Sequence, residues 1–312
     1  MISIIICSAS EEKSWSTQRN IEQTIEVEHE FIIINNKEKK WPIAKVYNYG
    51  ASQAKYPFLL FIHEDTRFLC NGWAELIIEK LSEETTGVIG FAGSKLRINT
   101  VHPGGWVSLP GYNSFNYVQG DGHAIFNNTR KRGFSLFREG ASQHTNFSQV
   151  VTIDGMAMFV RKELWERNSF DEVFLTGFHC YDIDFTLTLH HNGYKNYICT
   201  NQDVVFLHDS KGTYTDDWYR TTLYIHENKW SKMLPAYTDE VDISSFDIKK
   251  ISQKELYGFI KKAVKQSNLD FKEIESLIKK SRELYGVNIK DEVRLYTKYL
   301  WYRILRKAFI IK

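Results

Sequence analysis

Three consecutive titratable residues, His63, Glu64 and Asp65, follow an apolar run at residues 58–62 that predicts a buried strand. An imidazole and two carboxylates in this place could hold a divalent cation, which could in turn hold phosphate oxygens. In α/β proteins, ligands bind beyond the carboxyl ends of the strands, and this triplet lies at such an end. The alternative is that the acids only end the strand and cap the next helix.

The elements around this triplet alternate between strands and helices. Strands are predicted at residues 2–7, 31–34, 58–62, 88–92, 150–160 and 204–207, and helices at residues 14–25, 43–55, 73–81, 161–167 and 182–192. Near-continuous apolar strands that alternate with helices are typical of a parallel sheet covered on both faces. The predicted fold class is α/β: a mixed, mostly parallel sheet with helices on both faces, plus a C-terminal helical appendage.

Residues 93–149 interrupt this alternation. They are rich in Gly, Asn, Ser and aromatic residues and show no long periodic segment, so we expect a long loop region, which is usually functional in a compact domain. From about Lys249 the chain becomes helical and basic. Two parts are therefore expected, residues 1–235 and a basic helical C-terminal region at residues 246–312.

The charge of the chain is distributed unevenly. The net charge of +2 gives no indication of nucleic-acid binding, yet residues 245–312 hold 17 Lys and Arg against 8 Asp and Glu. The last 19 residues contain six Lys or Arg and no acid, interleaved with aromatic residues. This composition is typical of an amphipathic helix that contacts a membrane surface. The alternatives are packing on the main domain and contact with a partner protein.

The sequence also bears on the cellular compartment. The four cysteines lack metal-type spacing, which indicates a reducing environment. The apolar residues 2–6 are too few for a signal peptide, and no apolar run is long enough to cross a bilayer. We therefore expect a cytoplasmic protein, with peripheral contact at the inner face of the membrane through the C-terminal helix.

The order of several short motifs resembles the family 2-type glycosyltransferases, which have the A-type nucleotide-sugar transferase fold. The motifs are Asn48-Tyr49-Gly50, His63-Glu64-Asp65, Asp154-Gly155, Phe170-Asp171-Glu172, Tyr181-Asp182-Ile183-Asp184, His191-Asn192-Gly193-Tyr194, and His208 with Gly212. Each motif is weak alone, but their order is specific. The resemblance implies that residues 1–235 bind a nucleotide sugar and its acceptor.

In such enzymes an Asp-x-Asp motif holds the metal and the diphosphate, and His63-Glu64-Asp65 occupies its place. The resemblance therefore implies that Asp65 binds a divalent cation, Mn²⁺ or Mg²⁺, with His63 and His208 as further ligands. His63 replaces the first aspartate, which removes a negative charge and should weaken metal binding or shift it away from Mg²⁺. A subset of these proteins resembles this chain in having His-Glu-Asp.

The resemblance also implies a site for a nucleoside-diphosphate sugar, with a UDP-sugar favoured. The implied donor-binding residues are Ser8, Asn35, Asn48, His63, Glu64, Asp65 and Lys211. Similar enzymes have an aspartate at the position of Asn35, and an amide can donate as well as accept, so the base preference stays open. The alternative is that Asn35 serves only in a turn. Lys211 lies in a loop that could close over the diphosphate and neutralise its charge.

Asp182 matches the aspartate that acts as general base in similar enzymes, and Tyr181 stands where they have a glutamate. An acceptor hydroxyl that attacks an anomeric carbon must lose a proton, which a nearby carboxylate can take. The alternative for Asp182, and the favoured role for Asp184, is to complement the helix dipole. The implied acceptor-binding residues are Trp106, Tyr112, Asp154, Gly155 and Tyr181. The two rings, Trp106 and Tyr112, could stack on a sugar or pack in the core.

The predicted function is that of an inverting, metal-dependent glycosyltransferase, which moves a hexosyl or related sugar from a nucleoside diphosphate to a hydroxyl of a glycan or glycolipid. The alternative is a non-catalytic nucleotide- or carbohydrate-binding relative, because Asn35, His63 and Tyr181 depart from the usual pattern. A nucleotidyltransferase is disfavoured because no Gly-rich, basic triphosphate loop follows the first strand.

Overall fold

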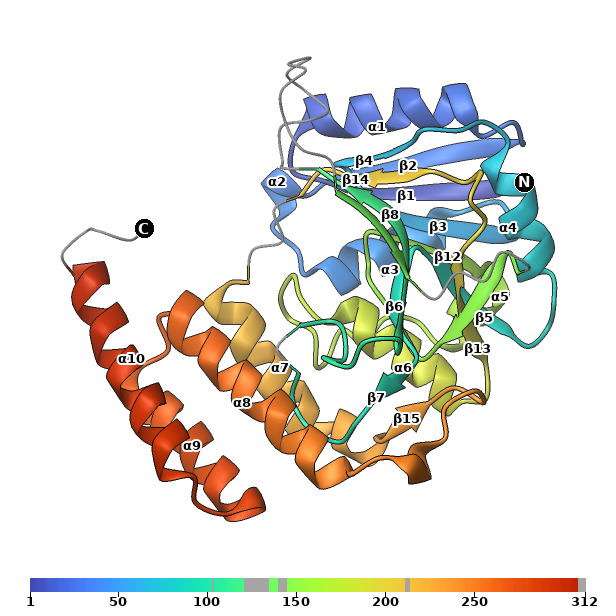
Figure 1. The fold of residues 1–312 in the computed structure, drawn as a ribbon. Helices are drawn as coiled ribbons and strands as arrows, with labels where there is room; N and C mark the ends of the chain where they lie inside the picture. Colours follow the sequence, from blue (N-terminus) through green and yellow to red (C-terminus); the bar gives the residue numbers. More distant parts are fainter. Residues whose placement is uncertain (103, 121–134, 140–144, 211–213, 308–312) are drawn as a thin grey trace.

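The computed structural model describes residues 1–102, 104–120, 135–139, 145–210 and 214–307, and a seven-stranded sheet forms its centre (Figure 1). The strands, in spatial order, are β10 (Phe147–Val150), β13 (Lys195–Cys199), β5 (Thr86–Gly90), β12 (Ala157–Arg161), β3 (Phe58–His63), β1 (Ile2–Ser8) and β2 (His29–Asn35). β1 is parallel to β2 and β3, and β5 to β13, whereas β12 and β10 run antiparallel to their neighbours. The predicted mixed α/β fold is confirmed, and β12 and β10 give it a larger antiparallel share than the apolar strands indicated.

Helices cover both faces of this sheet, because its strands are apolar on both sides. The helices on one face are α1 (Glu11–Thr24) and α4 (Trp73–Leu81), and those on the other are α3 (Ile43–Gln53), α5 (Lys162–Arg167) and α6 (Tyr181–His191). In β1, Ile4 and Ile6 pack with the first group and Ile5 with the second, and all three are fully buried. Side chains of a strand alternate between faces, so this central strand supplies both cores.

A second sheet lies where a long loop was expected, so that expectation was wrong. Its strands are β11 (Thr152–Ile153), β6 (Ala92–Ser94), β8 (Asn113–Gln119), β14 (Phe206–His208) and β4 (Thr66–Phe68), with β9 (Ser135–Glu139) paired to β8. A further pair joins β7 (Leu96–Arg97) and β15 (Ala236–Tyr237). Most of these strands are short, and β8 buries polar side chains such as Asn116, which donates to the carbonyls of Cys199 and Asn201 at 2.9 Å each. Such strands lack the alternating apolar pattern by which a strand is predicted.

The C-terminal region is helical, as predicted. Its helices are α8 (Ile248–Gln266), α9 (Phe271–Tyr285) and α10 (Ile289–Lys307). The remaining helical elements of the described chain precede it: α2 (Asn36–Lys39), α7 (Asp216–Asn228), η1 (Trp230–Lys232) and η2 (Ile243–Ser245). α9 begins with a capping box between Asp270 and Glu273. α8 packs on α7 through Phe259, which lies against Tyr219. In the described part of the chain no helix combines the length and the apolar composition that crossing a membrane requires.

A buried polar contact also joins α8 to the loop between β7 and β8. Glu255 is fully buried and accepts hydrogen bonds from the Ser108 backbone N–H at 2.7 Å and from the Ser108 hydroxyl at 2.9 Å. The ring of His102 lies 3.8 Å from the same carboxylate. Burial raises the pKa of Glu255, and the Ser108 donors oppose this rise. A buried carboxylate and an exposed serine 147 positions apart in the chain are thus joined by two hydrogen bonds.

Candidate active site

A cavity of about 410 Å³ opens at the carboxyl ends of β1 and β3, beside the start of α6. Its lining residues are Cys7, Ala9, Ile43, Tyr47, His63, Glu64, Asp65, Asp154, Phe178, His179, Cys180, Tyr181, Asp182, His208, Ser210, Tyr214 and Trp218. Seven of these lining residues were predicted as site residues, and they come from distant segments of the chain: His63, Glu64, Asp65, Asp154, Tyr181, Asp182 and His208. Another cavity, of about 520 Å³, lies among α8, α9 and α10 and contains none of them.

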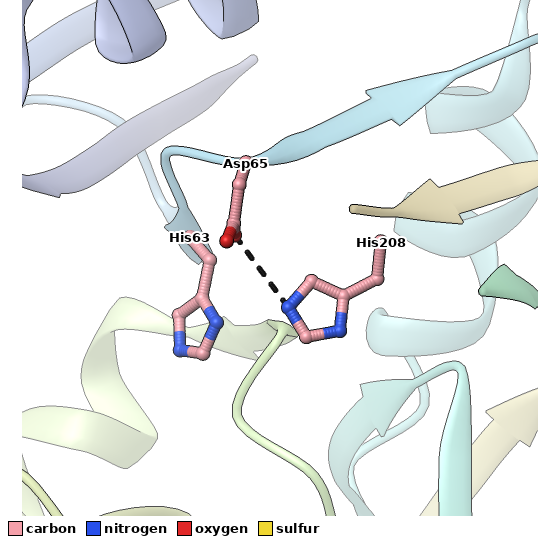
Figure 2. Close-up of side chains that lie close together, drawn as sticks. All are labelled: His63, Asp65 and His208. Carbon is pink, nitrogen blue, oxygen red and sulfur yellow. Dashed lines mark ion pairs between the residues drawn. The ribbon is translucent and has the colours of Figure 1, made fainter. Parts of the chain in front are cut away.

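The turn after β3 and the pairing of β4 with β14 bring Asp65 next to His208. The Thr66 hydroxyl donates to the His63 carbonyl at 2.8 Å, which closes the turn. In the antiparallel ladder Thr66 lies opposite His208, and the Asp209 N–H donates to the Asp65 carbonyl at 2.8 Å. As a result His208 Nε2 lies 3.5 Å from Asp65 Oδ1 (Figure 2).

His63, Asp65 and His208 together could hold a cation. One ligand atom from each lies within 4.8 Å of the others, and Figure 2 shows the three side chains converging. Mg²⁺ prefers an octahedral shell of oxygens, whereas imidazole nitrogens suit first-row transition metals. The donor set therefore fits a divalent cation.

The charges of these side chains depend on one another. Burial alone would raise the pKa of Asp65, but the contact with His208 and the nearby ring of His63 lower it. Burial alone would lower the pKa of His208, but Asp65, with Asp154 and Asp209, raises it. The pKa of His63 is lowered, first by burial and then by His208. The group thus combines an ionised carboxylate with a neutral His63 imidazole.

The Glu64 carboxylate is engaged by the loop between β1 and α1. Its Oε2 accepts hydrogen bonds from the backbone N–H groups of Ala9 and Ser10, each at 3.0 Å. Ser10 is the N-cap of α1, and its side chain accepts from the Lys13 N–H. Glu64 therefore holds the loop that forms one wall of the cavity, and its contact with the donor stays a prediction.

Asp182 is held in the cavity by the first turn of α6. Cys180, which precedes the helix, has a φ of +69°, a conformation that non-glycine residues rarely adopt. The Gly155 backbone N–H donates to Asp182 Oδ2 at 2.9 Å. Burial, and after it the charge of Asp154, raises the pKa of Asp182 to about 7. A carboxylate with this pKa is suited to accept a proton near neutral pH.

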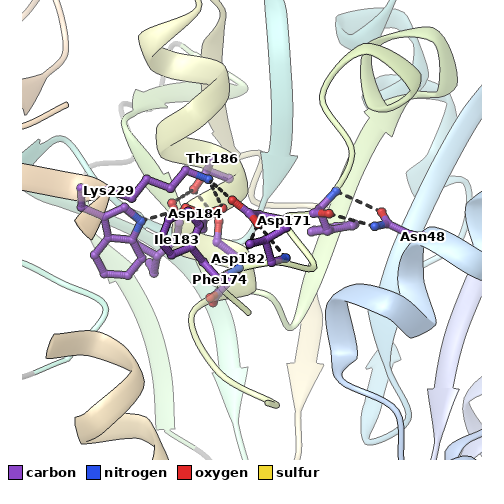
Figure 3. Close-up of polar contacts among 11 residues, drawn as sticks. Asn48, Asp171, Phe174, Asp182, Ile183, Asp184, Thr186 and Lys229 are labelled. Carbon is purple, nitrogen blue, oxygen red and sulfur yellow. Dashed lines mark hydrogen bonds and ion pairs between the residues drawn. The ribbon is translucent and has the colours of Figure 1, made fainter. Parts of the chain in front are cut away.

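Asp184, two residues further along α6, has a different environment. Its Oδ2 accepts from the Lys229 ammonium at 2.8 Å and its Oδ1 from the Trp230 indole at 2.9 Å (Figure 3). The same ammonium lies 2.8 Å from Asp171. Asp184 is 2% exposed, so it is a buried, paired charge that joins α6 to the segment after α7.

Asn48 does not line the cavity but ties α3 to α5. Its Oδ1 accepts from the Trp165 indole at 3.1 Å and from the Phe170 N–H at 3.0 Å, and its Nδ2 donates to the Phe170 carbonyl at 2.8 Å. These bonds also fix the segment that carries Asp171, as Figure 3 shows. The amide is therefore used in packing the fold around α6.

Four other predicted residues lie outside the lining of the cavity. Ser8 and Asn35 are paired at the carboxyl ends of β1 and β2. The Trp106 ring packs edge-on against Phe115, with the centroids 5.1 Å apart, and the Tyr112 ring packs in the same way against Phe246, also at 5.1 Å. Both rings are half-buried and pack on other aromatic rings of the protein. Lys211 lies outside the described residues.

Gly155 is covered by Tyr181, so the space beside it is not open to a sugar. A Cβ at this position would collide with the Tyr181 phenol. The Tyr181 hydroxyl donates to the Gly155 carbonyl at 3.2 Å and lies 2.8 Å from His63 Nε2. Tyr181 is 5% exposed and is thus part of the floor of the cavity.

A group of aromatic residues that the sequence motifs did not indicate also lines the cavity: Tyr47, Phe178, His179, Tyr214 and Trp218. The ring of His179 lies 2.9 Å from the hydroxyl of Thr215, the N-cap of α7. Phe178 and His179 are separated from Tyr181-Asp182 only by Cys180, and this proximity was an available signal. Tyr214 and Trp218 had no comparable signal, because they reach the cavity only through the placement of α7.

The mixed sheet and the cavity at its carboxyl edge define the A-type fold of nucleotide-sugar transferases. The chain belongs to the glycosyltransferase-like family, whose profile matches residues 2–228. No curated protein sequence matches it.

Two solved structures share this fold. GalNAc-T7, crystallised with UDP, GalNAc and Mn²⁺, is similar over 92% of this chain, with a TM-score of 0.51 and 12% identity. The chain spans 55% of the GalNAc-T7 chain. S. aureus TarS (1-349), in complex with UDP-GlcNAc, is similar over 99% of this chain and 91% of its own, with a TM-score of 0.50 and 10% identity. At such identities the likeness shows the fold alone.

Proposed function

We propose that the protein transfers a sugar from a nucleoside-diphosphate donor to a hydroxyl of a glycan or glycolipid acceptor. One observation carries this proposal: a single cavity contains Asp182, with a pKa of about 7, and the cation-competent group of His63, Asp65 and His208. Glycosyl transfer needs a base for the acceptor hydroxyl and positive charge for the departing diphosphate. Membership in the glycosyltransferase-like family supports this choice.

Asp182 acts as the general base in the proposed reaction. The N–H groups of Gly155 and Ile183 hold its carboxylate in place and oppose the rise of its pKa. The ionised carboxylate takes the proton of the acceptor hydroxyl while the hydroxyl oxygen attacks the anomeric carbon. The bond from that carbon to the diphosphate oxygen breaks on the opposite face, and its electron pair leaves with the nucleoside diphosphate. A single displacement of this kind inverts the anomeric configuration.

Asp65, His63 and His208 are the residues that would hold a divalent cation, with Mn²⁺ favoured. The cation, when bound, supplies positive charge to the diphosphate leaving group. Asp65 keeps its negative charge because His208 and His63 lower its pKa. The residues present therefore fit this role.

UDP-sugars are the donors that we expect. GalNAc-T7 was crystallised with UDP and TarS with UDP-GlcNAc, which supports a uridine nucleotide in a protein of the same fold. Cys7 and Ala9, at the end of β1, line the cavity and leave the carboxyl edge of the sheet accessible to a nucleotide. Asn35, paired with Ser8 at this edge, lies outside the lining of the cavity, so its contact with the base stays a prediction.

A thermal-shift panel tests the donor and the cation together, with UDP, GDP, dTDP and CMP, each with and without Mn²⁺. UDP at ~100 times its dissociation constant should stabilise the native state by about 2.7 kcal/mol. Mn²⁺ should enlarge this shift in the wild type and leave it unchanged in Asp65→Ala. A wild type that binds UDP-sugar but releases no UDP with any acceptor would favour the non-catalytic alternative.

We also propose that α10 contacts an anionic lipid surface at the inner face of the membrane. Leu295 and Tyr299 are buried against α8 and α9, so packing explains one face of α10. A second apolar stripe on α10 points away from that face. It consists of Val293, Leu300, Trp301 and Ile304, whose side chains are 54 to 65% exposed. Figure 1 shows α10 at the outer edge of the molecule.

The charges beside this stripe favour a lipid surface as its partner. Arg294 and Lys298 lie on the same helix, and Arg294 is exposed. From residue 294 onward the chain contains no acid. Apolar side chains flanked by cations suit the boundary of an anionic bilayer.

Sedimentation with vesicles tests this surface. The protein should bind vesicles that contain phosphatidylserine and not neutral ones. Trp301→Ser should weaken binding about fivefold, because burial of half an aromatic side chain contributes ~1 kcal/mol. Val173→Ser, which removes a side chain 82% exposed elsewhere in the molecule, is the matched control. A dimer that Trp301→Ser dissociates, without vesicle binding, would instead assign the stripe to a second copy of the chain.

A further inference from the structure

The two ring nitrogens of His63 have different surroundings. Nε2 lies 2.8 Å from the Tyr181 hydroxyl oxygen. Figure 2 shows the other nitrogen, Nδ1, directed toward Asp65 and His208. Only one of these nitrogens carries a hydrogen in a neutral imidazole, and only the other has a lone pair that can bind a metal ion.

The hydrogen bonds of Tyr181 define where that hydrogen lies. The phenol has one proton, which it donates to the Gly155 carbonyl at 3.2 Å. A carbonyl oxygen can only accept, so a phenol proton given to His63 instead would leave the Gly155 carbonyl without this hydrogen bond. Both contacts are satisfied together when the phenol donates to Gly155 and His63 donates from Nε2 to the phenol oxygen, which leaves the lone pair on Nδ1.

We propose that Tyr181 is a positioning residue that fixes His63 in the Nε2–H tautomer and directs the Nδ1 lone pair at the cation of Asp65 and His208. This inference rests on the cation site in the proposed function. Histidine ligands of metals commonly donate their second N–H to a neighbouring acceptor, which sets the orientation of the ring and the tautomer. A phenol oxygen is the acceptor here.

Packing prevents the Tyr181 phenol from turning away from His63. Its ring lies edge-on against Tyr47, with the centroids 5.5 Å apart, and against Phe170, at 6.0 Å. Gly155 leaves the space that the phenol occupies, since a Cβ there would collide with it. The Gly155 N–H also holds Asp182, so one glycine connects the base to the histidine of the cation group.

The tautomer of His63 can be measured in the wild-type protein without any metal. Two-dimensional ¹⁵N spectra of the imidazole nitrogens distinguish a protonated from an unprotonated nitrogen. We expect Nε2–H in the wild type and a mixture of tautomers in Tyr181→Phe. A wild-type His63 protonated at Nδ1 would overturn the proposal, whether or not the protein binds a cation.

Calorimetric titration with Mn²⁺ provides the second test. Loss of the partner that orients a metal-binding histidine weakens metal binding roughly 10- to 100-fold, so we expect this loss in Tyr181→Phe. Tyr214→Phe, which removes a phenol hydroxyl from the lining of the same cavity, is the matched control and should bind as the wild type does. In a His63→Ala background, Tyr181→Phe should have no further effect on Mn²⁺ affinity.

The outcomes separate this proposal from the one on which it rests. Wild-type Mn²⁺ binding that Asp65→Ala abolishes but Tyr181→Phe leaves unchanged would overturn the role of Tyr181 and keep the cation site. A further tenfold loss in the His63→Ala background would also overturn it, because Tyr181 would then act by another route. A wild type without Mn²⁺ binding would remove the cation from the proposed function, and the tautomer alone would decide whether Tyr181 orients His63.

Discussion

Asp182 and Asp184 lie two residues apart on α6, yet their surroundings give them opposite properties. Asp184 is paired with Lys229 at 2.8 Å and bonded to Trp230 at 2.9 Å. Asp182 faces the cavity, where backbone N–H groups and the like charge of Asp154 surround it. One helix turn therefore carries a carboxylate that is paired within the fold and another that we propose to be the general base.

The difference shows that burial alone does not give a carboxylate its role. Burial raises the pKa of both side chains, but Lys229 opposes the rise at Asp184, whereas Asp154 adds to it at Asp182. A buried charge with a cation and satisfied hydrogen bonds holds elements together. A carboxylate without such compensation binds a proton more readily, and this is the property that a general base requires.

The largest expected effect is on the activity of Asp182→Asn. The substitution keeps the shape of the side chain and removes the base, so kcat should fall roughly 10²- to 10⁴-fold. Donor binding in the thermal-shift assay should persist. The folded state raises the pKa of Asp182 from 3.8 to about 7, so this group stabilises the fold below pH 4 and ceases to do so as the pH rises through 7. Asp182→Asn should therefore have a Tm at pH 8 at least as high as that of the wild type.

In contrast to Asp182→Asn, Lys229→Met should lower the free energy of unfolding and leave kcat unchanged. Removal of one partner of a buried ion pair costs about 3–5 kcal/mol, which urea unfolding would measure. The loss should be smaller in the Lys229→Met/Asp184→Asn double variant, because no unpaired charge is then buried. Equal losses in the single and double variants would show that Lys229 acts through packing and not through its charge.

The pH dependence of kcat/KM tests the reactive side of the comparison. Because Asp182 must be ionised to accept a proton, the rate should fall about tenfold per pH unit below its pKa of about 7. Asp154→Asn should move the midpoint to lower pH, because the Asp154 charge is the second cause of the raised pKa. A profile that stays flat from pH 5.5 to 8 would contradict the role of Asp182 as the base.

The smallest expected effect is that of Asp171→Asn. Asp171 is the second partner of Lys229 and its side chain is 21% exposed, so solvent screens much of the interaction. The variant should lose about 1 kcal/mol in the free energy of unfolding, and kcat should be unchanged. A loss as large as that of Lys229→Met would mean that Asp171, and not Asp184, is the main partner of the lysine.

The sequence was sufficient to predict the first half of the fold and much of the site. Runs such as residues 58–62 predicted buried strands because they are apolar on both faces, and the structure has β3 there. The second sheet could not be predicted in this way, since β8 buries Asn116 and Ser114 among its apolar residues. Its polar side chains are satisfied by bonds to distant carbonyls, which no local pattern reveals.

The contact between the residues that depart from the glycosyltransferase pattern also could not be predicted from the sequence. His63 and Tyr181 each depart from it, and each alone could indicate loss of catalysis. The structure brings the two side chains to within 2.8 Å of one another, although they are 118 positions apart in the chain. The two departures from the pattern therefore lie in direct contact in the structure.

The hydrogen bonds between Glu255 and Ser108 join two segments that are synthesised at different times. A chain made from its N-terminus at ~5–20 residues per second needs roughly 7–30 s to pass from one partner to the other, a separation of 147 positions. During that interval the two Ser108 donors must be satisfied by water. The hydrogen bonds that join the loop after β7 to α8 can therefore form only after α8 has been synthesised.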